Sequence, residues 1–211
     1  MSKEFFPAIF DTLKQSPEIV AEGLDVVLDA VLDSDVLSHV PVISVAIKSL
    51  KIKDEFVFQR LKRNCRAFLD AVKDADRQKI EEMRLKLEET PEELEEFADT
   101  TMSVLLEGQK PVKSTLVGRL IVSLAEERIS LEEFQALSQL IQAGAVPAIL
   151  SLRDFFAATE GLPYRRGLGQ PAEEPLLLSL GFGYRSGDMF RISELGQILY
   201  KHGFGGSLHE A

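Results

Sequence analysis

Apolar residues recur every three or four positions along most of the first 158 residues, which is the period of an amphipathic α-helix. One segment shows this most clearly, with basic side chains off an apolar face made of Val57, Leu61, Cys65, Phe68 and Val72. Capping residues and prolines separate such segments from one another. The pattern predicts a mainly α-helical protein whose residues 1–158 form a multi-helix bundle.

Local signals mark where several of these helices begin. Ser16-Pro17-Glu18 has the order of an N-cap, a first-turn proline and an acidic residue, and predicts a helix start. Thr90-Pro91 predicts another start, with an end near Glu107 because a glycine follows. Ser130 opens a capping box that predicts a helix through Gln142.

The composition changes after residue 158. Three glycines and two prolines within Thr159–Pro171 predict a loop or linker over residues 159–172. A short apolar helix, Glu173–Leu180, is then followed by two candidate strands, Phe182–Arg185 and Met189–Ile192, joined by turn residues. With a last helix capped by Ser193, residues 173–211 are expected to form a small winged-helix-like α+β module with one β-hairpin and a flexible tail.

The chain is acidic, with a net charge of −10, which argues against a broad attraction to nucleic acid or anionic membrane. Residues 48–66 depart from this balance, because they carry seven basic and two acidic side chains. This candidate basic strip consists of Lys48, Lys51, Lys53, Arg60, Lys62, Arg63 and Arg66. Either the strip binds a membrane surface or a partner, or it pairs internally with the acidic segment Glu18–Asp33; internal pairing is favoured.

The segment Val36–Ile52 is the candidate for a membrane-spanning helix. It is shorter than the roughly 20 residues that a membrane-spanning helix needs, and it contains charged side chains, so a buried core helix is predicted. The first residues lack the zones of a signal peptide, and a single cysteine excludes an intramolecular disulfide. These observations predict a cytoplasmic location.

No constellation of residues points to catalysis. The three histidines, His39, His202 and His209, are isolated from one another in the sequence, and Cys65 falls on the apolar face of its helix. No serine stands in a nucleophile-elbow context. We therefore predict no catalytic residues, no cofactor site and no metal site, and a protein that is not an enzyme.

A winged helix that reads DNA places the helix before the hairpin in the major groove, where it needs basic or amide side chains. Here that helix reads "EEPLLLSL", which is acidic and apolar. DNA binding is therefore a minor alternative. The candidate interaction residues lie instead in the preceding loop and the hairpin, and they are Tyr164, Arg165, Arg166, Arg185 and Arg191.

Three segments carry a resemblance to uncharacterised bacterial helical proteins of about this size: "HVPVISVAIKSLKIKDEFVFQRLKR", "LVGRLIVSLAEERISLEEFQALSQLI" and "LGFGYRSGDMFRISELGQILYKHG". The last is also similar to the end of abortive-infection alpha-type proteins, with Ser193 and Gly196 at the turn before the final helix. The resemblance implies a bacterial or prophage context and a link to phage defence, and it transfers no catalytic residue.

The function hypothesis that follows is a non-enzymatic interaction or regulatory protein that acts through protein–protein contacts, with a protein partner or a second copy of the chain. Two alternatives stay open. One is a membrane-associating effector that uses Val36–Ile52 and the basic strip. The other is a nucleic-acid-binding regulator that uses the hairpin.

Overall fold

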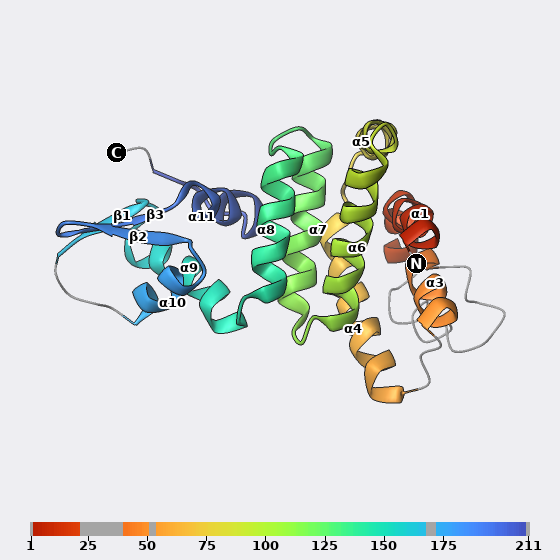
Figure 1. The fold of residues 1–211 in the computed structure, drawn as a ribbon, viewed down its shortest axis with the longest axis horizontal. Coiled ribbons are helices and arrows are strands. Elements are labelled where there is room, and N and C mark those ends of the chain that lie inside the picture. The colour runs from red at the N-terminus through yellow and green to blue at the C-terminus, as the bar shows by residue number, and fades with distance from the viewer. Residues whose placement is uncertain (1, 22–39, 51–53, 168–171, 210–211) are drawn as a thin grey trace. The chain divides into compact units, whose positions relative to one another are not determined.

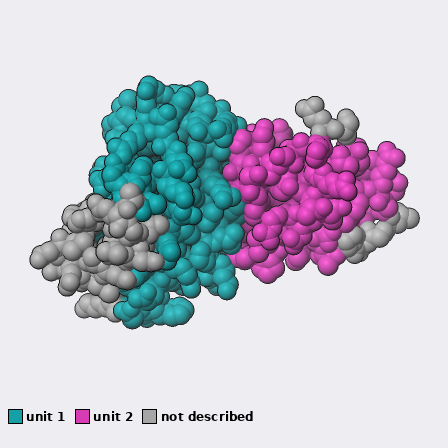
Figure 2. Space-filling model, turned by 180° about the vertical axis from the view of Figure 1, so that it is seen from behind, with its two compact units in different colours: residues 1–131 teal, residues 132–211 magenta. Residues whose placement is uncertain are grey.

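A computed structural model of the chain describes residues 2–21, 40–50, 54–167 and 172–209. The chain forms two compact units, residues 1–131 and residues 132–211, which Figure 2 distinguishes by colour. In its described residues unit 1 is helical throughout, whereas unit 2 combines helices with a small sheet. The predicted fold class, mainly α with a small α+β end, is confirmed.

Unit 1 is a bundle of helices whose labels follow Figure 1: α1 (Ser2–Ala21), α3 (Pro41–Leu50), α4 (Glu55–Val72), α5 (Arg77–Glu88), α6 (Pro91–Glu107) and α7 (Pro111–Ala125). Helices α6 and α7 form a hairpin (Figure 1). Asn64 of α4 fastens their connection, because its side-chain amide donates to the carbonyls of Leu105 at 2.9 Å and Gly108 at 2.7 Å. The predicted helix end at Glu107 is confirmed.

The closest helix packing in unit 1 is between α4 and α7. Gly118 of α7 lies so near α4 that an added Cβ would stand 3.0 Å from the Cβ of Ala71 and 3.2 Å from Val72. A second part of the core is aromatic, where Phe10 of α1 meets Phe6 at 4.7 Å and Phe97 of α6 at 5.7 Å between ring centroids. These contacts join helices that are far apart in sequence.

The predicted helix start at Ser16-Pro17 is wrong, because α1 runs through both residues. Proline lacks the N–H that would normally reach the carbonyl four residues earlier, which here belongs to Leu13. The Ser16 hydroxyl donates to that carbonyl instead, at 2.8 Å. The serine therefore supplies from within the helix the hydrogen bond that the proline removes.

Part of the apolar segment Val36–Ile52 forms α3, and the rest lies outside the described residues. In the described part Val40, Val42, Ile43 and Ala46 are buried, and the backbone N–H of Val42 donates to the Thr12 hydroxyl of α1 at 3.0 Å. These residues occupy the interior of unit 1, as the prediction of a core helix requires.

Unit 2 is built from helices around a three-stranded antiparallel sheet, in chain order α8 (Leu131–Ala143), α9 (Val146–Ala158), β1 (Tyr164–Arg166), α10 (Glu173–Ser179), β2 (Gly183–Ser186), β3 (Met189–Ile192), α11 (Glu194–Ile198) and the π-helical turn η1 (Leu199–Gly203). The sheet order is β1-β3-β2, so the predicted hairpin is present and β1 adds a third strand. Helices α9 and α10 lie on one side of this sheet (Figure 1).

The structure divides the chain at residue 131, whereas the sequence suggests a division at residue 158 and a linker over 159–172. The difference arises from α9, whose phenylalanines belong to the core around the sheet. Phe155 meets Phe190 of β3 at 5.6 Å, and Phe156 stacks on Tyr200 at 3.9 Å. Within the proposed linker, Tyr164–Arg166 forms strand β1.

The end of the chain, proposed as a flexible tail, is held against unit 2 as far as His209. The N–H of Gly206 donates to the Tyr200 carbonyl at 3.0 Å, and the N–H of His209 donates to the Gly161 carbonyl at 3.1 Å. An added Cβ on Gly161 would come within 2.6 Å of the His209 ring. The last turn of helix begins as predicted, because the Ser193 hydroxyl caps α11 by accepting from the Gly196 N–H.

Replacing Gly118 with a branched residue should destabilise unit 1. Gly118→Ile places a side chain where even a Cβ is crowded, so we expect a loss of about 2 kcal/mol in the free energy of unfolding. The neighbouring exposed position provides a control, since Arg119→Ile should cost about 0.5 kcal/mol. Urea denaturation measures the loss, and hydrogen exchange should assign it to α4 and α7. Equal losses in both variants would contradict the packing described for Gly118.

Lowering the pH should destabilise unit 1, because Glu81 becomes protonated and loses its ionic contacts. Hydrogen bonds from Arg84 and then Lys14 lower the pKa of Glu81 to about 2. A carboxyl group whose folded-state pKa is lowered stabilises the fold above its unfolded pKa, and this contribution disappears as the pH falls through the folded value. Glu81→Gln should therefore be less stable than the parent at neutral pH, and the difference should vanish between about pH 4.5 and about pH 2. Thermal unfolding over this range measures it; a constant difference would refute the assignment.

Candidate functional site

Strand pairing separates the five candidate interaction residues into two groups. Residues directly opposite one another in adjacent strands point to the same face of a sheet. Tyr164 of β1 is opposite Arg191 of β3, which is opposite Tyr184 of β2. The next row is Arg165, Phe190 and Arg185, and it points to the other face.

The inner face of the sheet is the one covered by α9 and α10. Phe190 is fully buried there, and the Arg165 guanidinium lies over the ring of Phe155 at 5.4 Å from its centroid. Arg165 and Arg185 extend on either side of Phe190 and reach Glu174 at the start of α10. Two of the five candidate residues therefore make contacts inside unit 2.

The Glu174 carboxylate joins both arginines, and we call this group the Glu174 brace. One oxygen accepts from Arg165 Nη2 at 2.8 Å, and the other accepts from Arg185 Nη2 at 2.7 Å and Nε at 3.1 Å. Glu174 is only 2% exposed. Hydrogen bonds between ionised partners are stronger than neutral ones, and burial keeps solvent from screening them. The brace therefore connects β1, β2 and α10.

Two further contacts extend the brace. Arg165 Nη1 donates to Glu173 Oε1 at 2.9 Å, and Arg185 Nη1 donates to the Gly167 carbonyl at 3.0 Å. Partial burial acts to raise the pKa of Glu173, but its backbone hydrogen bond and the Arg165 guanidinium outweigh this and lower it. Burial likewise opposes the charge on Arg165, yet hydrogen bonds to Glu174 and Glu173 raise its pKa. Both side chains stay charged at neutral pH.

The opposite side, which we call the outer sheet face, carries six side chains in two rows: Tyr164, Arg191 and Tyr184, and then Arg166, Met189 and Ser186. Tyr184 is 49% exposed, Arg166, Arg191 and Ser186 are exposed, and the other two are half-buried. None of the six is acidic. Neither Arg166 nor Arg191 forms an ion pair within the described part of the chain. This face thus brings together three of the five candidate residues.

Tyr184, Met189 and Ser186 were not among the sequence candidates. Strand alternation within the hairpin groups them on one face, opposite to Arg185 and Phe190. Which of the two faces is covered depends on the packing of α9 and α10, which the hairpin sequence does not encode. A choice by residue type alone therefore included Arg185, which is inside, and omitted Tyr184, which is outside.

The side chains of the outer sheet face are of kinds that form non-covalent contacts with a ligand. Its tyrosines and arginines offer aromatic surface, hydroxyl groups and guanidinium donors. Nowhere in the described ranges do three or more His, Cys, Asp or Glu side chains gather in a way that could hold a metal ion. Cys65 is fully buried in unit 1, and burial raises the pKa of its thiol.

Four members of the basic strip lie on α4, namely Arg60, Lys62, Arg63 and Arg66, with Arg63 and Arg66 exposed. Lys51 and Lys53 lie outside the described residues, as does the side chain of Lys48. The proposed internal partner, Glu18–Asp33, is described only at its beginning. There Glu18 pairs with Arg77 of α5 and not with the strip, and this pairing lowers the pKa of Glu18.

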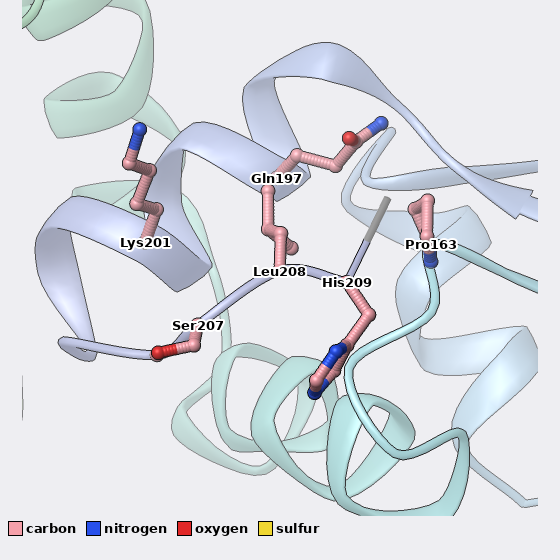
Figure 3. Close-up of a pocket in the computed structure, with 7 residues that line it drawn as sticks. Pro163, Gln197, Lys201, Ser207, Leu208 and His209 are labelled. Atoms are coloured by element: carbon pink, nitrogen blue, oxygen red, sulfur yellow. The ribbon is translucent and has the colours of Figure 1, made fainter. Parts of the chain in front are cut away.

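Unit 2 also contains a shallow cavity of about 600 Å³ beside the end of the chain. It is lined by Pro163, Gln197, Lys201, Gly206, Ser207, Leu208 and His209. The side chains of Lys201, Ser207 and His209 point in different directions in Figure 3, and the Gln197 amide donates to the Ile192 carbonyl. Converging polar groups, the usual mark of a ligand site, are absent from this lining.

No known protein family, curated protein or solved structure matches this chain. Within the described residues, no individual helix is both long enough and apolar enough for a membrane span. Helices α8 and α9 meet these criteria only as a pair, bent by 118°. Their phenylalanines Phe134, Phe155 and Phe156 are fully buried, so the apolar character of the pair serves the core of unit 2.

Removing the charge of Glu174 should destabilise unit 2. Glu174→Gln leaves two guanidinium groups without a common anion, and breaking a buried ion pair typically costs about 3 kcal/mol. Glu173→Gln, which removes only one contact of Arg165, should cost about 1 kcal/mol. Hydrogen exchange of the β1, β2 and β3 amides measures both losses. If the two substitutions accelerate exchange equally, Glu174 does not have the central role described above.

Proposed function

We propose that this protein is a non-enzymatic interaction protein whose outer sheet face binds a partner protein. The observation that carries the proposal is the row of Tyr164, Arg191 and Tyr184 across three strands, with Arg166 and Met189 in the next row. Tyrosine, arginine and methionine are enriched at protein–protein interfaces, whereas acidic residues are depleted there. Tyrosine and arginine are also the residues that most often dominate binding energy.

The construction of the sheet supports this proposal. The Glu174 brace and Phe190 hold the covered side of all three strands, so the exposed side chains stand on a fixed backbone. A surface that is already ordered loses little conformational entropy when a partner binds.

Nucleic acid is the less favoured partner. Residues 132–211 carry six basic and nine acidic side chains, and two of the arginines are already bound to Glu174. Contacts with phosphates supply most of the affinity of nucleic-acid-binding proteins, and they need more free cations than this unit offers.

We also propose a bacterial context with a link to phage defence. This part of the proposal rests on the resemblance of residues 180–203 to the end of abortive-infection alpha-type proteins.

A photo-crosslinker on the outer sheet face should capture the partner. Tyr184→p-benzoylphenylalanine, irradiated in bacterial cells that express the full chain, should give discrete protein adducts that resist nuclease. Adding Arg191→Glu should lower their yield about tenfold, because interface arginines of this kind are often worth 1.4 kcal/mol or more. Adducts between two copies of the chain would identify the partner as a second copy.

A matched control places the same crosslinker at Tyr200, whose ring stacks on Phe156 inside unit 2. This position should give no intermolecular adduct. Equal adducts at both positions, or none at Tyr184, would refute the proposal. Adducts that disappear on nuclease treatment would favour the nucleic-acid alternative.

A further inference from the structure

Phe56 is the most exposed large apolar side chain in the described part of the molecule, at 74%. It stands in the first turn of α4, and Figure 1 shows that this end of α4 extends beyond the loop that joins α6 and α7. Unit 1 buries its six other phenylalanines, which are Phe5, Phe6, Phe10, Phe58, Phe68 and Phe97. A single exposed apolar side chain is ordinary on a protein surface, so the residues next to Phe56 decide what this end of α4 can bind.

Two arginines follow Phe56 on the same side of α4; Arg63 is exposed, whereas Arg60 is half-buried and its Nε is enclosed. Arg60 and Arg63 follow it by four and seven residues, the spacing that places side chains on one side of a helix. The opposite side, which includes Leu61 and Cys65, is buried against the bundle. Neither Arg60 nor Arg63 forms an ion pair in the ranges that the structure describes. We call Phe56, Arg60 and Arg63 the α4 tip.

The two acidic residues at the start of α4, Asp54 and Glu55, already have hydrogen-bond partners. Asp54 caps the helix by accepting from the N–H groups of Phe56 and Val57, and Glu55 accepts from the Gln59 amide at 2.7 Å. Residues 54–66 carry four basic and two acidic side chains, a local excess of two positive charges. In physiological solution salt screens charges over about 8 Å, so only carboxylates closer than this act strongly at the tip.

We propose that the α4 tip binds the surface of an anionic lipid membrane, with the Phe56 ring at the level of the headgroups and Arg60 and Arg63 against lipid phosphates. An exposed aromatic ring next to basic side chains on a helix is the combination that interfacial membrane-binding helices use. A convex tip with one ring and flexible cations suits a fluid surface, which needs no shape complementarity. This proposal is independent of the function proposed for the outer sheet face, which lies in the other unit.

Vesicle sedimentation with the full chain tests the proposal. Vesicles of phosphatidylcholine with one third phosphatidylglycerol should bind the protein at least about tenfold more strongly than phosphatidylcholine alone. Phe56→Ser should lower binding to the anionic vesicles about tenfold. Arg60→Glu with Arg63→Glu should lower it about 25-fold or more, since each basic residue near such a surface contributes about fivefold. Added salt should weaken binding of the parent chain.

The matched controls are Leu85→Ser, which removes another exposed apolar side chain, and Arg153→Glu, which reverses another exposed arginine. Both should bind vesicles like the parent, and all variants should keep the parent's thermal unfolding temperature. Absence of vesicle binding, or equal binding to neutral vesicles, would overturn the proposal. So would equal losses in the controls, or a polyglutamate peptide or single-stranded RNA that binds the tip while vesicles do not.

Discussion

The carboxylate of Glu174 is the point where the parts of unit 2 are held together. Strand β1 brings Arg165, strand β2 brings Arg185, and α10 brings the anion that both need. The sheet has only three short strands, and so small a sheet requires packing on one face to be stable. Phe190 and Phe155 provide the apolar part of that packing. The Glu174 brace holds β1 and β2 in a fixed orientation to α10. The outer sheet face owes its fixed geometry to this arrangement.

The acidic residues at the start of α10 have a role in the fold that the sequence alone does not indicate. In the sequence, Glu173 and Glu174 indicate a helix that would repel DNA. In the fold they neutralise arginines of the neighbouring strands, so the same carboxylates are a structural requirement of the sheet. Helix α10 is only seven residues long and its acidic end is bound to arginines, so it is poorly suited to read bases in a major groove.

Features encoded locally could be predicted from the sequence. The helix end at Glu107, the helix end predicted at Gln142 and found at Ala143, the hairpin around Gly187 and the Ser193 cap each depend on residues within one or two turns. Features that depend on distant residues could not. The pairing of β1 with β3 joins segments that flank α10. The Ser16-Pro17 pair has the sequence of an N-cap, but it lies within α1. The candidate residues were divided between two faces for the same reason: alternation puts Tyr184 and Arg185 on opposite faces, but the packing of α9 and α10 decides which face is covered.

An acidic protein can nevertheless present basic contact surfaces, and two features of this chain show how. On the inner sheet face and around Glu81, carboxylates are matched to specific cations at hydrogen-bonding distance, which uses their charge locally. On the outer sheet face and at the α4 tip, arginines stand without a paired carboxylate in the described residues. Since screening limits each charge to its immediate surroundings, a partner at either proposed surface would meet these arginines and not the net charge of −10. Placement, and not total charge, therefore decides which surfaces of this protein attract anions.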